Sequence, residues 1–163
     1  YAGDNFHYRA GYTFVDAQLE KDFISPQTGG VVAPAGSTLP GAPESVLSLN
    51  LDYTWQMGSD MDLIGAMDVY YQSESENFID QASLVNETYD SFTLLGASVT
   101  LASGPWRATL YGRNLTDEAA PSGGFAQSNW SYDTGIFESW YGNGNRQFIV
   151  QPRTFGLKLG YRF

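Results

Sequence analysis

Apolar and polar residues alternate with a period of two along this chain, most cleanly from Val46 to Gln56. The apolar side chains of that segment fall on one face: Leu47, Leu49, Leu51, Tyr53 and Trp55. The opposite face carries Ser48, Asn50, Asp52, Thr54 and Gln56. Because successive side chains of a strand point to opposite sides, this period predicts a β-strand and not a helix.

The same alternation recurs in other segments of the chain. They are Phe6–Phe14, Asp62–Glu74, Thr93–Leu101, Trp106–Arg113 and Phe155–Phe163. An aromatic share of 15%, together with 18 glycines, also favours strands and turns over helices. The sequence therefore predicts an all-β fold, an antiparallel up-and-down meander of about six strands.

Short and long connections take turns between these strands. Residues 57–60 and 102–105 form tight, glycine-containing turns, whereas 20–45, 75–91 and 117–151 are long. Long loops count against a compact soluble domain, but they are the expected arrangement on one rim of an outer-membrane barrel. Ten residues tilted by about 45° rise about 24 Å, close to the apolar band of roughly 25 Å in such barrels. The strands are thus predicted to be part of a transmembrane β-barrel.

Composition excludes several other classes of function. The formal net charge is −10, which argues against a nucleic-acid partner. The chain has no cysteine, so it offers no disulfide and no thiolate nucleophile or metal ligand. No window approaches 18 consecutive apolar residues, and residue 1 is not followed by a signal-peptide pattern. A soluble sandwich or lipocalin-like barrel, with the apolar face turned inward, remains the structural alternative.

Catalysis has little support in the sequence. The single histidine, His7, lies on the polar face of a strand, with Asp4 and Asp16 as conceivable carboxylate partners. The carboxylate pairs Glu74–Glu76 and Asp60–Asp62 indicate a solvated rim more than a Ca²⁺ site. We therefore expect no catalytic residue, no metal and no cofactor.

The loop from Gly123 to Gln147 is the best candidate for contact with a ligand, because it holds aromatic side chains in a polar, glycine-rich segment. The candidate residues are Phe125, Trp130, Tyr132, Trp140, Tyr141 and Arg146, the last suited to an anionic group. Tyr70 and Glu74 are added because they lie on the polar face near the long-loop rim. The alternative is that the aromatic side chains pack on neighbouring loops or on another domain.

Three motifs resemble those of TonB-dependent receptors. Leu110–Glu118, with its Asn-Leu-Thr-Asp stretch, resembles their penultimate strand, and Pro152–Phe163 resembles their last strand. Gly36–Glu44 resembles a loop before an earlier strand. Tyr161 and Phe163 also resemble the terminal aromatic-x-aromatic signal for outer-membrane assembly, although Lys158 stands where that signal has glycine.

The resemblance implies that residues 1–163 are the C-terminal part of an outer-membrane β-barrel domain without its plug domain. Since the smallest spanning barrels have 8 strands, about six cannot close one. The expected partners are outer-membrane lipid, the remaining barrel strands and plug, the TonB complex through an N-terminal region, the barrel assembly machinery and a small solute.

The expected function is uptake of a solute such as a siderophore or glycan across the bacterial outer membrane. Two alternatives remain open: a passive pore or structural barrel subunit, and a soluble β-sandwich that binds carbohydrate.

Overall fold

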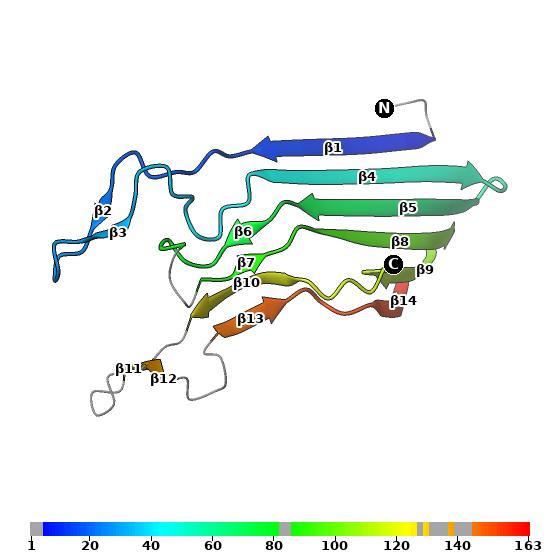
Figure 1. The fold of residues 1–163 in the computed structure, drawn as a ribbon. Coiled ribbons are helices and arrows are strands. Elements are labelled where there is room, and N and C mark those ends of the chain that lie inside the picture. Colours follow the sequence, from blue (N-terminus) through cyan, green and yellow to red (C-terminus); the bar gives the residue numbers. More distant parts are fainter. Residues whose placement is uncertain (1–4, 82–85, 127–128, 131–136, 139–144) are drawn as a thin grey trace.

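A computed structural model describes residues 5–81, 86–126, 129–130, 137–138 and 145–163, and its main feature is one antiparallel sheet (Figure 1). The six strands of this sheet lie in the order β1 (Phe6–Phe14), β4 (Ser45–Gln56), β5 (Met61–Gln72), β8 (Phe92–Ser103), β9 (Trp106–Arg113) and β14 (Thr154–Tyr161). Each strand pairs with the next one along the chain among these six. The expected meander is thus confirmed.

The described residues contain no helix long and apolar enough to span a membrane.

The long connections all leave the same end of the sheet and carry small hairpins of their own (Figure 1). These hairpins are β2 (Phe23–Ile24) with β3 (Val31–Ala33), β6 (Ser75–Glu76) with β7 (Thr88–Tyr89), β10 (Pro121–Ala126) with β13 (Asn145–Ile149), and β11 (Asn129–Trp130) with β12 (Phe137–Glu138). These hairpins were not predicted from the sequence: most of their strands have only two or three residues, and the longer β10 and β13 show no regular alternation of apolar and polar residues.

The two tight turns lie at the opposite end of the sheet (Figure 1). Ser103 pairs with Trp106, so the turn between β8 and β9 consists only of Gly104 and Pro105. Gly104 has a φ of 52°, which a glycine adopts without the steric cost of a side chain. Strand β8 therefore extends two residues further than its alternation indicated.

Strand β5 ends earlier than the sequence predicted. Its pairing with β4 and β8 stops at Gln72: the Ser73 N–H still donates to the Ser45 carbonyl in register, but the Ser45 N–H donates to the Ser73 hydroxyl. Glu74 therefore lies outside the strand, in the connection to β6.

The register carries the alternation across the whole sheet, so one face is continuously apolar. Across the three strands β14, β9 and β8, Leu157 faces Leu110, which faces Val99, and Leu159 faces Ala108, which faces Leu101. Leu110, Leu157 and Leu159 are 61%, 65% and 68% exposed. Since burying one leucine is worth about 1.5–3 kcal/mol, a water-soluble protein would cover such a face. No second sheet packs on it among the described residues, contrary to a β-sandwich.

The buried core is small and lies at the long-loop end. Phe92, Ala120 and Val150 form its centre, and Tyr70 and Leu94 pack against it. Because Tyr70, Phe92 and Leu94 belong to the polar face by register, the main sheet has no core on its apolar side.

Two glycines of β14 provide a direct test of how the polar face is packed. A Cβ at Gly156 would overlap the ring of Tyr111, its partner on β9, whereas a Cβ at Gly160 would lie 3.9 Å from its nearest neighbour, the Arg107 carbonyl oxygen. We predict that Gly156→Ala lowers the free energy of unfolding by about 1–3 kcal/mol and that Gly160→Ala has a much smaller effect. Urea unfolding in lipid vesicles measures both, and equal effects would contradict the packing of Tyr111 over Gly156.

Candidate functional site at the long-loop end

Charged side chains of opposite sign occupy different strands of the polar face. Asp52 and Asp68 lie on β4 and β5, while Arg107, Arg113 and Lys158 lie on β9 and β14. Arg9 on β1 adds a positive charge on the other side of the acidic strands, so both signs are spread over the polar face, which suits a water-filled or protein-filled interior.

His7 lies on this polar face and pairs with Asp52, its cross-strand partner. The distance from its Nδ1 to the Asp52 Oδ2 is 3.0 Å, and both side chains are partly exposed. Asp16, which the sequence offered as a partner, lies beyond the end of β1, and Asp4 is outside the described residues. This histidine–carboxylate pair is a side-chain contact between β1 and β4.

The base of the longest loop folds over the polar face. Ala120 precedes β10 and Val150 follows β13, and both are buried against Phe92 of β8. The backbone N–H of Val150 donates to the Ala120 carbonyl at 3.1 Å. Tyr70 packs here with its ring centroid 6.1 Å from that of Phe92 and donates a hydrogen bond to the Gln72 side chain. Tyr70 therefore supports the loop base as well as facing the interior.

A second contact joins this loop to the one before it. The Tyr89 side chain is buried, and its hydroxyl lies where a Cβ of Gly124 would stand. Burial raises the pKa of Tyr89, and the negative charge of Glu87 raises it further, while the nearby Asn77 side chain opposes both. Gln147 also donates a hydrogen bond to the Glu87 carboxylate. The β6–β7 and β10–β13 hairpins are thereby held together.

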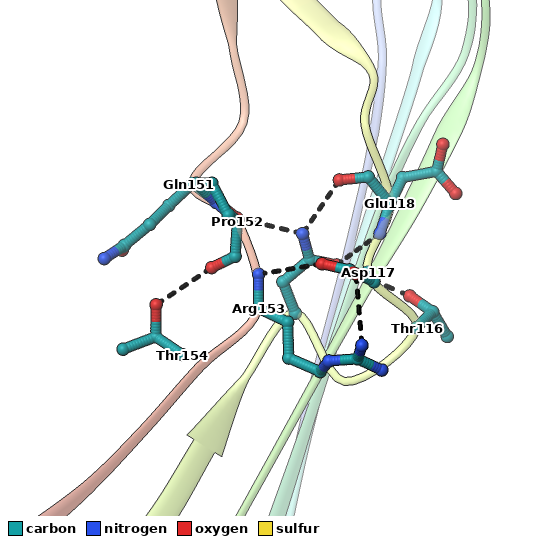
Figure 2. A network of polar contacts seen from close by, with 8 residues as sticks. Thr116, Asp117, Glu118, Gln151, Pro152, Arg153 and Thr154 are labelled. Carbon is teal, nitrogen blue, oxygen red and sulfur yellow. Dashed lines mark hydrogen bonds and ion pairs between the residues drawn. The ribbon is translucent and has the colours of Figure 1, made fainter.

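Asn114 closes the base of the longest loop by bonding Glu118 on one side and Gln151 on the other, two residues that Figure 2 labels. It is 5% exposed, and its amide nitrogen donates to the carbonyls of Glu118 at 2.8 Å and Gln151 at 2.9 Å. Its side-chain oxygen accepts the N–H of Glu118 at 2.9 Å. A single buried side chain therefore connects the end of β9 with the chain that leads into β14.

Asp117 and Arg153 add an ion pair beside Asn114 (Figure 2). One Asp117 oxygen accepts the Arg153 backbone N–H at 3.2 Å, and the other lies 3.1 Å from a guanidinium nitrogen of Arg153. The Asn-Leu-Thr-Asp stretch noted in the sequence thus has a physical role, because its Asn and its Asp each bind the other side of the loop.

Glu74 lies apart from Tyr70. It lines a hollow of about 480 Å³ at the rim, together with Glu44, Glu76 and Tyr71. Tyr71 faces Leu47 on the apolar face, so this hollow belongs to the rim and not to the polar interior that Tyr70 faces. The Glu76 carboxylate already accepts hydrogen bonds from Asn86 and Thr88, and no described group of three acidic or histidine side chains is placed to hold a metal.

The structure describes part of the predicted ligand-contact loop. Phe125 on β10 lies opposite Arg146 on β13, and Trp130 on β11 lies opposite Phe137 on β12. Arg146 is exposed. The remaining candidates lie outside the described residues: Tyr132, Trp140 and Tyr141.

Tyr161 and Phe163 lie with Trp106 at the short-turn end, on the apolar side of the sheet. The ring of Tyr161 is 4.7 Å from that of Trp106 and 5.1 Å from that of Phe163, in edge-on arrangements. The N–H of Arg162 donates to the Pro105 carbonyl and extends the pairing beyond β14. Aromatic rings are typical of the two interfaces of a membrane barrel.

Sequence reasoning missed the residues that hold the loops together. Tyr89, Gly124, Ala120 and Val150 are spread through aperiodic segments and give no pattern. Asn114 does give a signal in the sequence. It is followed three residues later by Asp117, and Asn and Asp are the residue types with a side chain that best tolerate the left-handed backbone of a sharp turn.

The contact of Tyr89 with Gly124 predicts the effect of a methyl group at residue 124. We expect Gly124→Ala to displace β10 from β7 and to lower the stability of that contact by about 1–3 kcal/mol. Amide hydrogen exchange of residues 86–90 and 146–150 should accelerate. Gly30→Ala in the β2–β3 connection, where a Cβ meets only an ordinary contact at 3.5 Å, is the control. Unchanged exchange in Gly124→Ala would contradict the contact.

The raised pKa of Tyr89 predicts an alkaline weakening of the same contact. The folded state favours the neutral phenol, so this contribution is complete below the unfolded pKa of about 10 and is lost as the pH rises through the folded pKa. Amide exchange of residues 86–90 should therefore show a pH-dependent step above pH about 10, beyond the intrinsic increase. Tyr89→Phe should remove that step, and its persistence in this variant would show another cause.

Comparison with known proteins agrees with this geometry. Residues 2–115 match the family model described as "TonB dependent receptor-like, beta-barrel". No curated protein and no solved structure matches the chain. The match spans β1, β4, β5, β8 and β9, and β14 joins them through its pairing with β9. With most of its length matched and all six long strands in one meander, the chain belongs to the TonB-dependent receptor-like β-barrel family.

Proposed function

We propose that this chain forms part of the wall and the ligand-contacting loops of a transporter that takes up a small solute across the bacterial outer membrane. The observation that carries the proposal is the continuous apolar face, exposed from β1 to β14, on strands of a receptor-barrel family. In such barrels an apolar band faces lipid and the alternating polar residues line the interior. TonB-dependent receptors are transporters, not enzymes.

The length of the strands supports a spanning role. β4, β5 and β8 have 12 residues each. Tilted by about 45°, such strands rise roughly 29 Å, enough to cross an apolar band of about 25 Å. The short turns would then face the periplasm and the long loops the outside, where a solute first meets the receptor.

The charged side chains of the polar face would line the interior of the barrel. The side chains from β4 and β5 are acidic and those from β9 and β14 are basic, so a plug domain in the interior would meet both signs. We infer that the remaining barrel strands, the plug and the contact with the TonB complex come from outside residues 1–163, and that the barrel assembly machinery inserts the protein.

Solute contact is assigned to the tip of the longest loop. Phe125, Trp130, Tyr132, Trp140 and Tyr141 supply aromatic surface, and Arg146, exposed on β13, supplies a positive charge. Tyr70 borders the interior beneath this loop, and Glu74 lies in the rim hollow. Aromatic side chains and one cation suit a siderophore or a glycan with an anionic or hydroxyl-rich surface.

Uptake measurements test the transport proposal. The complete receptor is produced in cells that lack other receptors, and uptake of labelled iron(III)-siderophores and oligosaccharides is followed with and without a proton uncoupler. We expect uptake of one solute class that stops when the uncoupler is added. Entry that is unaffected by the uncoupler would instead show a passive pore.

Alanine in place of Trp130, Trp140 and Tyr141 should weaken binding of the transported solute by about tenfold or more, since contact aromatics commonly contribute over 1 kcal/mol each. The amount of folded receptor should not change. If the solute concentration at half-saturation does not change in these variants, the three residues do not contact the solute. The matched control is Phe78→Ala, which removes an aromatic ring from another loop.

Neighbouring residues of β8 test the membrane orientation. Val99 is 50% exposed on the apolar face, whereas Ser98 lies on the polar face between Ala66 and Tyr111. Val99→Arg should destabilise the inserted barrel by about 2–4 kcal/mol, as a charge near the middle of the bilayer does. Ser98→Arg should insert normally. Equal amounts of both variants in outer-membrane fractions would contradict the orientation.

A further inference from the structure

The chain leaves β9 and returns to β14 through a compact group of contacts, here called the latch: residues 114–118 on one side and 151–153 on the other (Figure 2). Arg113 and Thr154 are the last paired residues of the sheet at this point. The latch therefore forms the part of the loop that directly adjoins the sheet.

The backbone of the latch has an unusual shape. Asn114 and Asp117 have φ values of 48° and 57°, the only positive values at non-glycine residues in the described part of the chain. Asn and Asp accept this left-handed conformation better than other residues with a side chain. Two such residues within four positions turn the chain sharply, and the Asp117 N–H donates to the Asn114 carbonyl at 2.9 Å to close the turn.

The turn directs the loop towards one face of the sheet. Two residues after the latch, Ala120 is buried against Phe92, and Val150 is buried there on the returning side. Pro121 then pairs with Ile149 to begin the β10–β13 hairpin. Because Phe92 and Leu94 belong to the polar face, the base of the hairpin packs on that face of the sheet, and β10 also contacts β7.

The strength of the contacts indicates what the latch does. Asp117 and Arg153 are 50% and 45% exposed, and an exposed ion pair adds little to stability because water screens it. Asn114 is buried, and its side chain satisfies one N–H and two carbonyl groups of the turn. These contacts act on the two sides of the turn, outside the backbone ladder that holds the sheet together.

We propose that the latch is a positioning device that turns the β10–β13 hairpin inward over the mouth of the barrel and holds it there. Asn114, Asp117 and Arg153 are its positioning residues. Its consequence for solute contact rests on the proposed transport function, because the hairpin carries Phe125 and Arg146 and leads to the aromatic tip.

Distances between two spin labels test the latch without any solute. Residues 1–163 contain no cysteine, so labels are attached to Ile149→Cys on β13 and Tyr12→Cys on β1, both exposed, in the complete receptor in lipid vesicles, with any cysteine elsewhere in the receptor replaced by serine. We expect one narrow distance distribution. Asn114→Ala and Asp117→Asn should each broaden it, while the amount of folded, heat-modifiable barrel stays the same.

Two further variants separate the hydrogen bonds from other effects. Asn114→Gly keeps a residue that accepts a φ of 48° but removes the side chain, so it should broaden the distribution as Asn114→Ala does. Glu118→Gln removes a neighbouring charge whose side chain makes no contact in the latch, which uses only the Glu118 backbone, and should leave the distribution narrow.

A distribution that stays narrow in Asn114→Gly and Asp117→Asn would overturn the proposal. So would a loss of folded barrel that accounts for the whole effect, since the latch would then be a stabilising contact only. The distances are measured whether or not the receptor takes up a solute, so failure of the transport proposal would be seen separately.

Discussion

The backbone ladder between neighbouring strands is the interaction on which this structure depends. A chain that crosses hydrocarbon must pair every backbone N–H and C=O within the protein, and a meander of antiparallel strands does so with the shortest connections. Five consecutive strand pairings do so for the four inner strands, while the outer edges of β1 and β14 have no partner strand among the described residues. Their register keeps odd and even positions on separate faces, and a slip of one residue would place every leucine of a strand in the interior.

The two ends of the sheet are built from different kinds of contact. At the short-turn end, Gly104 and Pro105 return the chain in two residues and aromatic rings gather around Tyr161. At the long-loop end, water replaces lipid, so polar contacts and a small core can hold loops in place. Phe92, Tyr89 and Asn114 are the residues around which these loops assemble, and they bring segments far apart in sequence into one unit.

The long strands were predictable because their period of two is imposed by burial on one side only. All six appear within a few residues of the predicted bounds, and the departures have physical causes. Strand β5 ends at Gln72 because the Ser45 N–H donates to the Ser73 side chain, and β8 runs on to Ser103 because a glycine-proline turn needs only two residues. Where a strand ends depends on the neighbouring segment with which it pairs. The alternation within one segment does not show which segment that is.

The loop end was less predictable, because its contacts join residues that have no fixed spacing. Tyr70 was expected to face the interior and does so, but its packing on Phe92 depends on where residues 120 and 150 return. Glu74 was placed on a strand by extending the alternation too far, and it lies in a rim hollow. The Asn-Leu-Thr-Asp stretch was recognised only as a resemblance, and its contacts with Gln151 and Arg153 give the reason for its residue types.

The sidedness of the strands in a bilayer is the central claim, and collision rates of spin labels measure it most directly. Labels placed one at a time from Leu95 to Leu101 on β8, in the complete receptor in lipid vesicles, are exposed to oxygen, which partitions into lipid, and to a water-soluble nickel chelate. We predict that Leu95, Ala97, Val99 and Leu101 collide with oxygen, and Gly96, Ser98 and Thr100 do not. An absence of alternation, or the opposite alternation, would contradict the account.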